Sequence, residues 1–242
     1  MKLRRFAAVV ALALVVPSLA ALLPAAAAER SPVVVELFTS QGCNSCPPAD
    51  ALLAELAKRP DVLPLSFHVD YWDYLGWKDP FASKANTERQ RAYVRSLHAR
   101  YAYTPQVVIG GAAQEVGSNR AQVETLIRHA EVAAAAGPDI AVEGGRVRVG
   151  AAAGAPAAAV WIAFFRRASA NEVPRGENAG KRLATTNAVR EIRLLGSWDG
   201  RAAEFAFDAA PPPAGCDGAA ILVQRPGPGA ILAARVLDLP AR

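Results

Sequence analysis

A strand-like run leads directly into a closely spaced cysteine pair, and this junction constrains the fold more than any other segment. Residues 33–38 are Val-Val-Val-Glu-Leu-Phe, which is typical of a buried central strand, and Cys43 and Cys46 follow with two residues between them. Cys-x-x-Cys at the start of a helix is the spacing of redox-active thiols. We expect the free N–H groups and the dipole of that helix start to favour an exposed Cys43 thiolate as the nucleophile, while Cys46 resolves the mixed disulfide.

Two prolines directly after the pair leave a second arrangement open. In a helix that began at Cys43, Pro47 would remove the first intrahelical hydrogen bond. The alternative is a helix that begins at Pro47, with both cysteines in a turn above it and a weaker effect of the helix dipole. A structural disulfide that never exchanges is a further alternative for Cys43 and Cys46.

The first residues have the three-part form of a bacterial export signal. Basic residues before position 6 precede an apolar run at 6–23, and the small residues at 25–28 offer an Ala-x-Ala cleavage site. We expect residues 1–28 to be cleaved and the mature chain to be periplasmic or secreted, without a stable membrane anchor. An uncleaved anchor is the alternative, and the short apolar run disfavours it.

Charge and cysteine count narrow the function further. Three of the 27 basic residues and none of the 22 acidic ones lie in residues 1–28, so the net charge of +5 falls to about +2 in the mature chain. The sequence therefore predicts no nucleic-acid partner, since the arginines between 89 and 100 fit a solvated helix face. Cys216 is left without an obvious partner, and we expect a half-buried thiol with no chemical role.

The segment 29–137 alternates between strand and helix patterns and ends at Gly137-Pro138. Apolar periodicity, capping residues and glycine turns predict the order β-α-β-α-β-β-α. We expect the first two strands to be parallel neighbours and the last two to form a hairpin. The expected strands are 33–38, 62–69, 107–109 and a short one through 116, and the expected helices are 50–59, 80–100, with Asp79 as N-cap, and 120–136.

With a Cys-x-x-Cys opening the first helix and Thr104-Pro105 before the third strand, this order resembles the thioredoxin fold. More narrowly, the chain resembles a family of secreted bacterial thioredoxin-like proteins known only as a domain of unknown function. The motifs that carry this resemblance are ELFTSQGCNSCPPAD at 36–50, HVDYWD at 68–73, YTPQ at 103–106 and RGENAG at 175–180. The resemblance implies a cis Pro105 against the sulfurs, with Thr104 shaping a groove for an extended polypeptide.

Aromatic and acidic residues gather where the second strand is expected to end. His68, Asp70, Tyr71 and Trp72 should lie at the same edge of the sheet as the cysteines, because ligands of open α/β sheets bind beyond the carboxyl ends of the strands. We assign these four residues to the substrate groove, with His68 or Asp70 as proton carriers. Aromatic side chains that only close the loop onto the sheet are the alternative.

A metal site is a further alternative at this edge. Two thiolates and an imidazole suit copper or zinc, so Cys43, Cys46 and His68 together define a metal-carrier hypothesis. No second Cys-x-x-Cys and no His-x-x-x-His motif accompanies them. We therefore assign no metal ligand and no cofactor.

The segment 138–242 changes to short strands between glycine and proline breaks and predicts a mostly β, sandwich-like domain of about seven strands. Within it, residues 175–181 are one residue short of a phosphate-binding loop and lack its Ser or Thr, so we reject that interpretation. The loop is either a lid over the thiols or a surface connection. The expected strands are 140–143, 146–149, 158–166, 188–195, 203–208, 219–224 and 230–237.

The sequence thus predicts an α/β protein with a thioredoxin-like fold followed by a C-terminal mostly β domain. We expect thiol/disulfide exchange with protein thiols or disulfides, in which Cys43 attacks and Cys46 resolves. The competing hypothesis from another functional class is a binding module with a static disulfide that recognises a polypeptide or sugar, because fold alone does not select a function. The sequence leaves the direction of exchange and the oligomeric state open.

Overall fold

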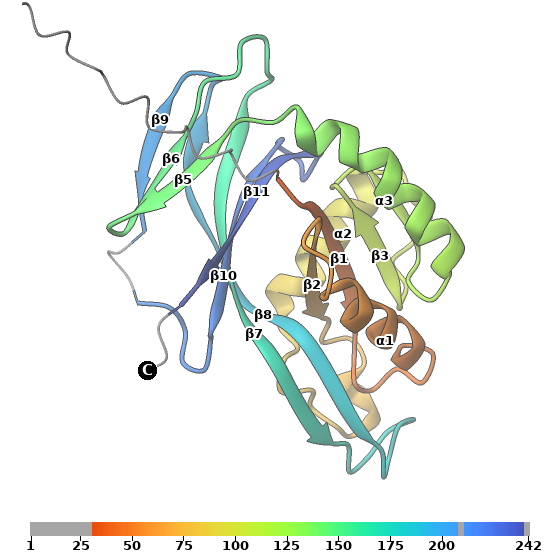
Figure 1. Cartoon of the computed structure of the whole chain (residues 1–242). Coiled ribbons are helices and arrows are strands. Elements are labelled where there is room, and N and C mark those ends of the chain that lie inside the picture. Colours follow the sequence, from red (N-terminus) through yellow and green to blue (C-terminus); the bar gives the residue numbers. More distant parts are fainter. Residues whose placement is uncertain (1–30, 208–210, 240–242) are drawn as a thin grey trace, which may run out of the picture.

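The computed structural model describes residues 31–207 and 211–239, so the expected export signal lies outside the described residues (Figure 1). Within these ranges no helix combines the length and the apolar character that a membrane span needs. The elements are β1 (Val33–Thr39), α1 (Pro47–Leu56), β2 (Val62–His68), the short 3-10 helix η1 (Asp73–Leu75), α2 (Lys84–Ser96), β3 (Gln106–Ile109), β4 (Ala113–Val116), α3 (Arg120–Ala135), β5 (Ile140–Glu143), β6 (Arg146–Val149), β7 (Ala158–Glu172), β8 (Arg182–Trp198), β9 (Ala203–Ala206), β10 (Gly218–Gln224) and β11 (Ile231–Asp238).

The first half has the predicted β-α-β-α-β-β-α order. β1 and β2 are parallel, with Val33 opposite Val62, and β3 pairs antiparallel with the other side of β1. β3 and β4 form the predicted hairpin around Gly110 and Gly111, both of which have positive φ. An α/β architecture is therefore confirmed, and both cysteines lie between β1 and α1.

The second half contributes seven strands, but they do not form a separate sandwich. β5, β6 and β9 make a small antiparallel sheet, whereas the others extend the first sheet in the order β11-β10-β7-β8-β2-β1-β3-β4 (Figure 1). The junction is a parallel contact between β2 and β8, where Ser66 pairs with Ala188. Because an open β2 edge would leave backbone donors and acceptors unpaired, β8 completes the sheet there.

Apolar side chains form one buried cluster on each face of the first half and a third in the second half. α1 and α3 cover one face of β1 and β3, and Tyr93 of α2 joins the cluster on the opposite face. The small sheet packs on β7, β10 and β11 and forms the third cluster. These contacts fix the edge of the sheet from which the cysteine turn projects.

A buried polar network ties the two halves together. Glu36, in the middle of β1, is 0% exposed. Its Oε1 forms an ion pair with Arg89 of α2, whose Nε lies 2.7 Å away. Tyr93 Oη donates to the other oxygen of Glu36, and Gln224 of β10 bonds to both Arg89 and Tyr93. Since each buried group has a partner, this network joins β1, α2 and β10 without an uncompensated charge.

Several predicted boundaries were wrong. α1 runs from Pro47 to Leu56 instead of over 50–59. α2 begins at Lys84, with the Ser83 side chain accepting from Asn86 N, instead of at Asp79-Pro80, because the Asp79 carboxylate is engaged elsewhere. β7 and β8 are also far longer than expected. They pair over almost their whole length as one antiparallel hairpin that continues past the sheet to the end of the molecule where α1 begins (Figure 1).

Candidate functional site

Cys43 and Cys46 form a disulfide in the turn that joins β1 to α1, with their Cα atoms 5.5 Å apart. Cys43 N donates to Ser40 O and Cys46 N donates to Cys43 O, so the backbone of the turn is internally bonded. α1 begins at Pro47, with Cys46 as the N-cap residue. The second arrangement inferred from the prolines is therefore the observed one.

The helix start does not offer the free N–H groups that we expected for a thiolate. The first two helical residues are prolines, which have no N–H, and the N–H groups of Ala49 and Asp50 both donate to Cys46 O. Ser45 is the polar group beside the sulfur instead, since its Oγ lies 3.3 Å from Cys43 Sγ. A thiolate formed at Cys43 would therefore be stabilised by a serine hydroxyl more than by the helix backbone.

Both cysteines are fully buried, whereas Cys43 was predicted to be exposed. Each residue has an exposed fraction of 0%. Trp72 covers one side of the turn, because a Cβ added at Gly42 would lie only 3.0 Å from Trp72 Cβ. The tip of the β7–β8 hairpin, residues 173–181, contacts another side of the turn. Cys43 is therefore buried by tertiary contacts, and the prediction of an exposed Cys43 was wrong.

The hairpin tip binds the backbone of the cysteine turn through two side chains. The Asn178 amide nitrogen donates to Gln41 O at 3.0 Å and to Cys43 O at 2.8 Å. Glu177 Oε2 accepts from Asn44 N at 3.1 Å. The loop that the sequence left as either a lid or a surface connection therefore lies directly against the disulfide turn.

Trp72, Thr104 and Pro105 are brought together beside the same turn. Trp72 Nε1 donates to Thr104 Oγ1 at 2.8 Å, and the Thr104-Pro105 peptide bond is cis, as the resemblance implies. Pro105 lies close to the start of α1, because a Cβ added at Gly117 would touch both Ala49 and Pro105. The structure therefore brings these three residues together beside the disulfide turn.

Tyr71 and Asp70 face α2 instead of the sulfurs. Tyr71 Oη donates to Gln90 Oε1 at 3.2 Å. Thr87 Oγ1 donates to Asp70 Oδ1 at 2.6 Å and accepts from Asp70 N. Their bonds hold the loop after β2 onto α2, which positions Trp72.

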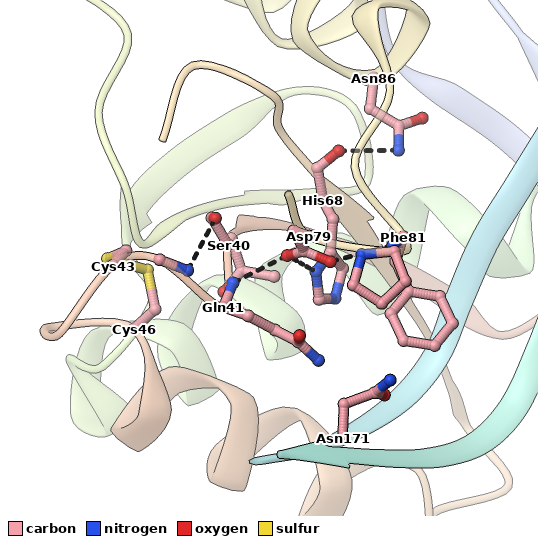
Figure 2. A network of polar contacts seen from close by, with 12 residues as sticks. Ser40, Gln41, Cys43, Cys46, His68, Asp79, Phe81, Asn86 and Asn171 are labelled. Carbon is pink, nitrogen blue, oxygen red and sulfur yellow. Dashed lines mark hydrogen bonds and ion pairs between the residues drawn. A yellow bond between two sulfur atoms is a disulfide. The ribbon is translucent and has the colours of Figure 1, made fainter. Parts of the chain in front are cut away.

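His68 forms a buried ion pair with Asp79, a residue that the sequence analysis assigned to a helix cap. His68 Nδ1 lies 2.6 Å from Asp79 Oδ2, and the same carboxylate accepts from the backbone N–H groups of Gln41 and Phe81 (Figure 2). Burial lowers the pKa of His68, but the charge and hydrogen bond of Asp79 and the charge of Asp50 together outweigh it, and the net pKa is raised. Burial raises the pKa of Asp79, yet His68 and the backbone donors bring it below its ordinary value.

Asp50 completes a group of titratable side chains beneath the disulfide. It lies one helical turn after Cys46, and its Oδ2 accepts from Thr39 Oγ1 at 3.3 Å. Thr39 pairs with His68 across β1 and β2, so the two side chains share the face covered by α1. Loss of hydration raises the pKa of Asp50 from 3.8 to about 6, and the charge of His68 offsets only part of that rise.

The side chains of the metal-carrier hypothesis do not come together as a set of metal ligands among the described residues. Within residues 31–207 and 211–239, no three or more His, Cys, Asp or Glu side chains are grouped closely enough to hold a metal ion. The sulfurs of Cys43 and Cys46 are bonded to each other, which leaves His68 without thiolate neighbours for the metal-carrier hypothesis. Cys216 is partly buried and unpaired, and burial raises the pKa of its thiol.

Comparison with known proteins gives a family and two solved structures of similar fold. The family described as "Protein of unknown function (DUF1223)" matches residues 34–224. The crystal structure of protein AGR_C_4864 from Agrobacterium tumefaciens is 34% identical, covers 88% of this chain and 99% of its own, and has a TM-score of 0.73. HBP35 of Porphyromonas gingivalis is 16% identical over 87% of this chain and 76% of its own, with a TM-score of 0.57, and shows similarity of fold alone. A search of curated proteins finds no match.

Proposed function

The chain belongs to the DUF1223 family of unknown function, and we propose that it is an exported thioredoxin-like protein that exchanges disulfides with protein thiols through Cys43 and Cys46. The disulfide between these two residues, at the edge of the sheet where β1 ends, is the observation that carries the proposal. The element order, the helix that follows Cys46 and the neighbouring cis Pro105 support a thioredoxin-like assignment. The basic and apolar pattern of residues 1–28 supports export.

The proposed exchange moves two electrons in two substitutions. A thiolate of a substrate dithiol attacks Cys43 Sγ, forms a mixed disulfide and releases Cys46 Sγ as the leaving thiolate. The second substrate thiol, after losing its proton, attacks the substrate sulfur of the mixed disulfide and releases Cys43. The substrate leaves oxidised and the Cys43/Cys46 pair is left as a dithiol. The reverse sequence reduces a substrate disulfide.

Asp50 is the side chain placed to exchange a proton with Cys46 during these steps. It shares a helix face with Cys46 at a separation of one turn, and its pKa of about 6 allows it to hold or release a proton near neutral pH. The His68–Asp79 ion pair lies on the same face of the sheet and supplies a nearby positive charge. We assign Asp50 to proton transfer and His68 to positioning and charge balance. Ser45 would stabilise a Cys43 thiolate.

Trapping a mixed disulfide tests this proposal. A Cys46→Ser variant lacks the resolving thiol, so Cys43 should accumulate as a mixed disulfide when the protein meets an oxidised substrate polypeptide. A Cys43→Ser variant should trap far less, and a Cys216→Ser background excludes adducts at the third thiol. Mass spectrometry under non-reducing conditions identifies the adduct. Absence of any Cys43 adduct in the Cys46→Ser variant would contradict an exchange function and favour a static disulfide in a binding module.

A further inference from the structure

We propose that the tip of the β7–β8 hairpin, residues 173–181, is a cover that must leave the Cys43–Cys46 disulfide before a thiol attacks it, and that Asn178 is its latch. We further infer that an extended polypeptide around the substrate thiol displaces this latch. The second statement rests on the proposed exchange function. The first rests only on the contacts between the tip and the cysteine turn.

The cover is built from buried contacts. Asn178 is 0% exposed although it lies in a loop, and its side-chain nitrogen donates to the carbonyls of Gln41 and Cys43. Lys181 Nζ donates to Asn178 Oδ1 at 2.9 Å, which fixes the orientation of the amide. Both N–H groups of the Asn178 amide are thus used on the cysteine turn, which makes this side chain a specific contact between the tip and the site.

The tip is arranged so that it can move without disturbing the sheet. Val173 N donates to Lys181 O and Gly180 N donates to Val173 O, so the hairpin closes with regular backbone bonds at the base of the tip. Gly176 and Gly180 have φ of 87° and 78°, and a Cβ added at Gly180 would meet no atom within 4 Å. The segment between Val173 and Lys181 can therefore change conformation while β7 and β8 stay paired.

The burial of the disulfide makes this movement necessary for exchange. A thiolate attacks a disulfide sulfur directly and forms a bond to it, so the sulfur must be accessible. Cys43 and Cys46 each have an exposed fraction of 0%, which leaves no path for a protein thiol in the structure described. Reaction therefore requires a covering segment to move, and we assign that movement to the tip because Asn178 and Glu177 hold it directly on the cysteine turn.

A polypeptide substrate can replace what the latch provides. When Asn178 leaves, Gln41 O loses its side-chain donor, Cys43 O keeps only the bond from Cys46 N, and Asn44 N loses the acceptor supplied by Glu177. An extended polypeptide carries backbone N–H and C=O groups at short intervals and can satisfy both kinds of group. A small thiol reagent offers no such set and depends on spontaneous opening.

Reduction kinetics test the latch independently of any exchange activity. The rate of reduction of the oxidised protein by a phosphine is measured by quenching and mass-tagging the free thiols. Asn178→Ala should accelerate reduction about tenfold or more, because two hydrogen bonds that hold the cover closed are lost. The matched control is Arg182→Ala, which changes an exposed residue at the start of β8 and should leave the rate unchanged. Equal rates for Asn178→Ala and the wild type would overturn the cover.

Asn178→Asp provides a second variant in case the alanine variant folds poorly, since a carboxylate cannot donate to the two carbonyls and should also accelerate reduction. Circular dichroism checks that each variant is folded. The polypeptide claim is tested by comparing a dithiol peptide with dithiothreitol. The wild type should favour the peptide, and Asn178→Ala should lose most of that preference. An unchanged preference would overturn displacement by the polypeptide. If Asn178→Ala is reduced faster than the wild type by the phosphine but neither protein reacts with the peptide, the cover is retained and the exchange function is rejected.

Discussion

Replacing Asp50 by asparagine should stabilise the oxidised protein at neutral pH and leave its stability at pH 3 almost unchanged. The pKa of Asp50 rises from 3.8 to about 6 on folding, because its carboxylate loses hydration. A raised carboxyl pKa means that the folded state binds the proton more tightly than the unfolded state, so stability falls as the pH rises from about 3.8 to about 6. At about 1.4 kcal/mol for each pH unit, the loss approaches 3 kcal/mol above pH 6.

Urea denaturation of both proteins at several pH values measures this difference. The free energy of unfolding of Asp50→Asn should exceed that of the wild type by about 2–3 kcal/mol at pH 7, and the excess should vanish below pH 4. Glu143→Gln, a carboxylate-to-amide change at an exposed position of β5, is the matched control. A pH-independent difference between Asp50→Asn and the wild type would refute the assignment of a desolvated, titrating carboxylate beneath the disulfide.

Three further substitutions should each lower the free energy of unfolding. His68→Ala leaves the buried Asp79 carboxylate without its cation and should cost about 3–5 kcal/mol in urea unfolding at pH 6, with a smaller cost at a pH well above the raised pKa of His68. Arg89→Met leaves the buried Glu36 carboxylate without its cation and should cost a similar amount, and calorimetry should show a lower transition temperature. Gly117→Ala places a Cβ 2.8 Å from a methyl group of Leu37 and should lower stability by about 1–3 kcal/mol; an unchanged melting temperature would contradict that packing.

Local sequence signals were sufficient for the elements that carry the cysteines. The apolar run 33–38 forms the central strand β1 because each of its residues is buried. Pro47 and Pro48 lack N–H groups, which left open a helix that begins at Pro47, and this alternative is the observed one. The order of strands and helices up to residue 137 followed from the same kind of local evidence.

Tertiary contacts explain the features of the structure that local sequence signals did not predict. Asp79 followed by proline has the residue types of a helix N-cap, but the charge of His68 and two backbone donors hold its carboxylate in the core instead. A lone Glu36 in an apolar strand signals a buried partner, although nothing in the sequence distinguishes Arg89 from the other arginines of its helix. Neither the pairing of β8 with β2 nor the placement of Asn178 over the turn has a local signal, because each joins segments more than 100 residues apart.

The central claim is that the Cys43/Cys46 couple exchanges with foreign thiols, and its reduction potential is the most direct test. The oxidised fraction is measured by mass-tagging free thiols after equilibration in defined dithiol/disulfide buffers, in a Cys216→Ser background. We predict a single two-electron transition at a potential above about −300 mV, in the range of exchange catalysts. A couple that stays oxidised well below about −300 mV would contradict the account and identify a structural disulfide.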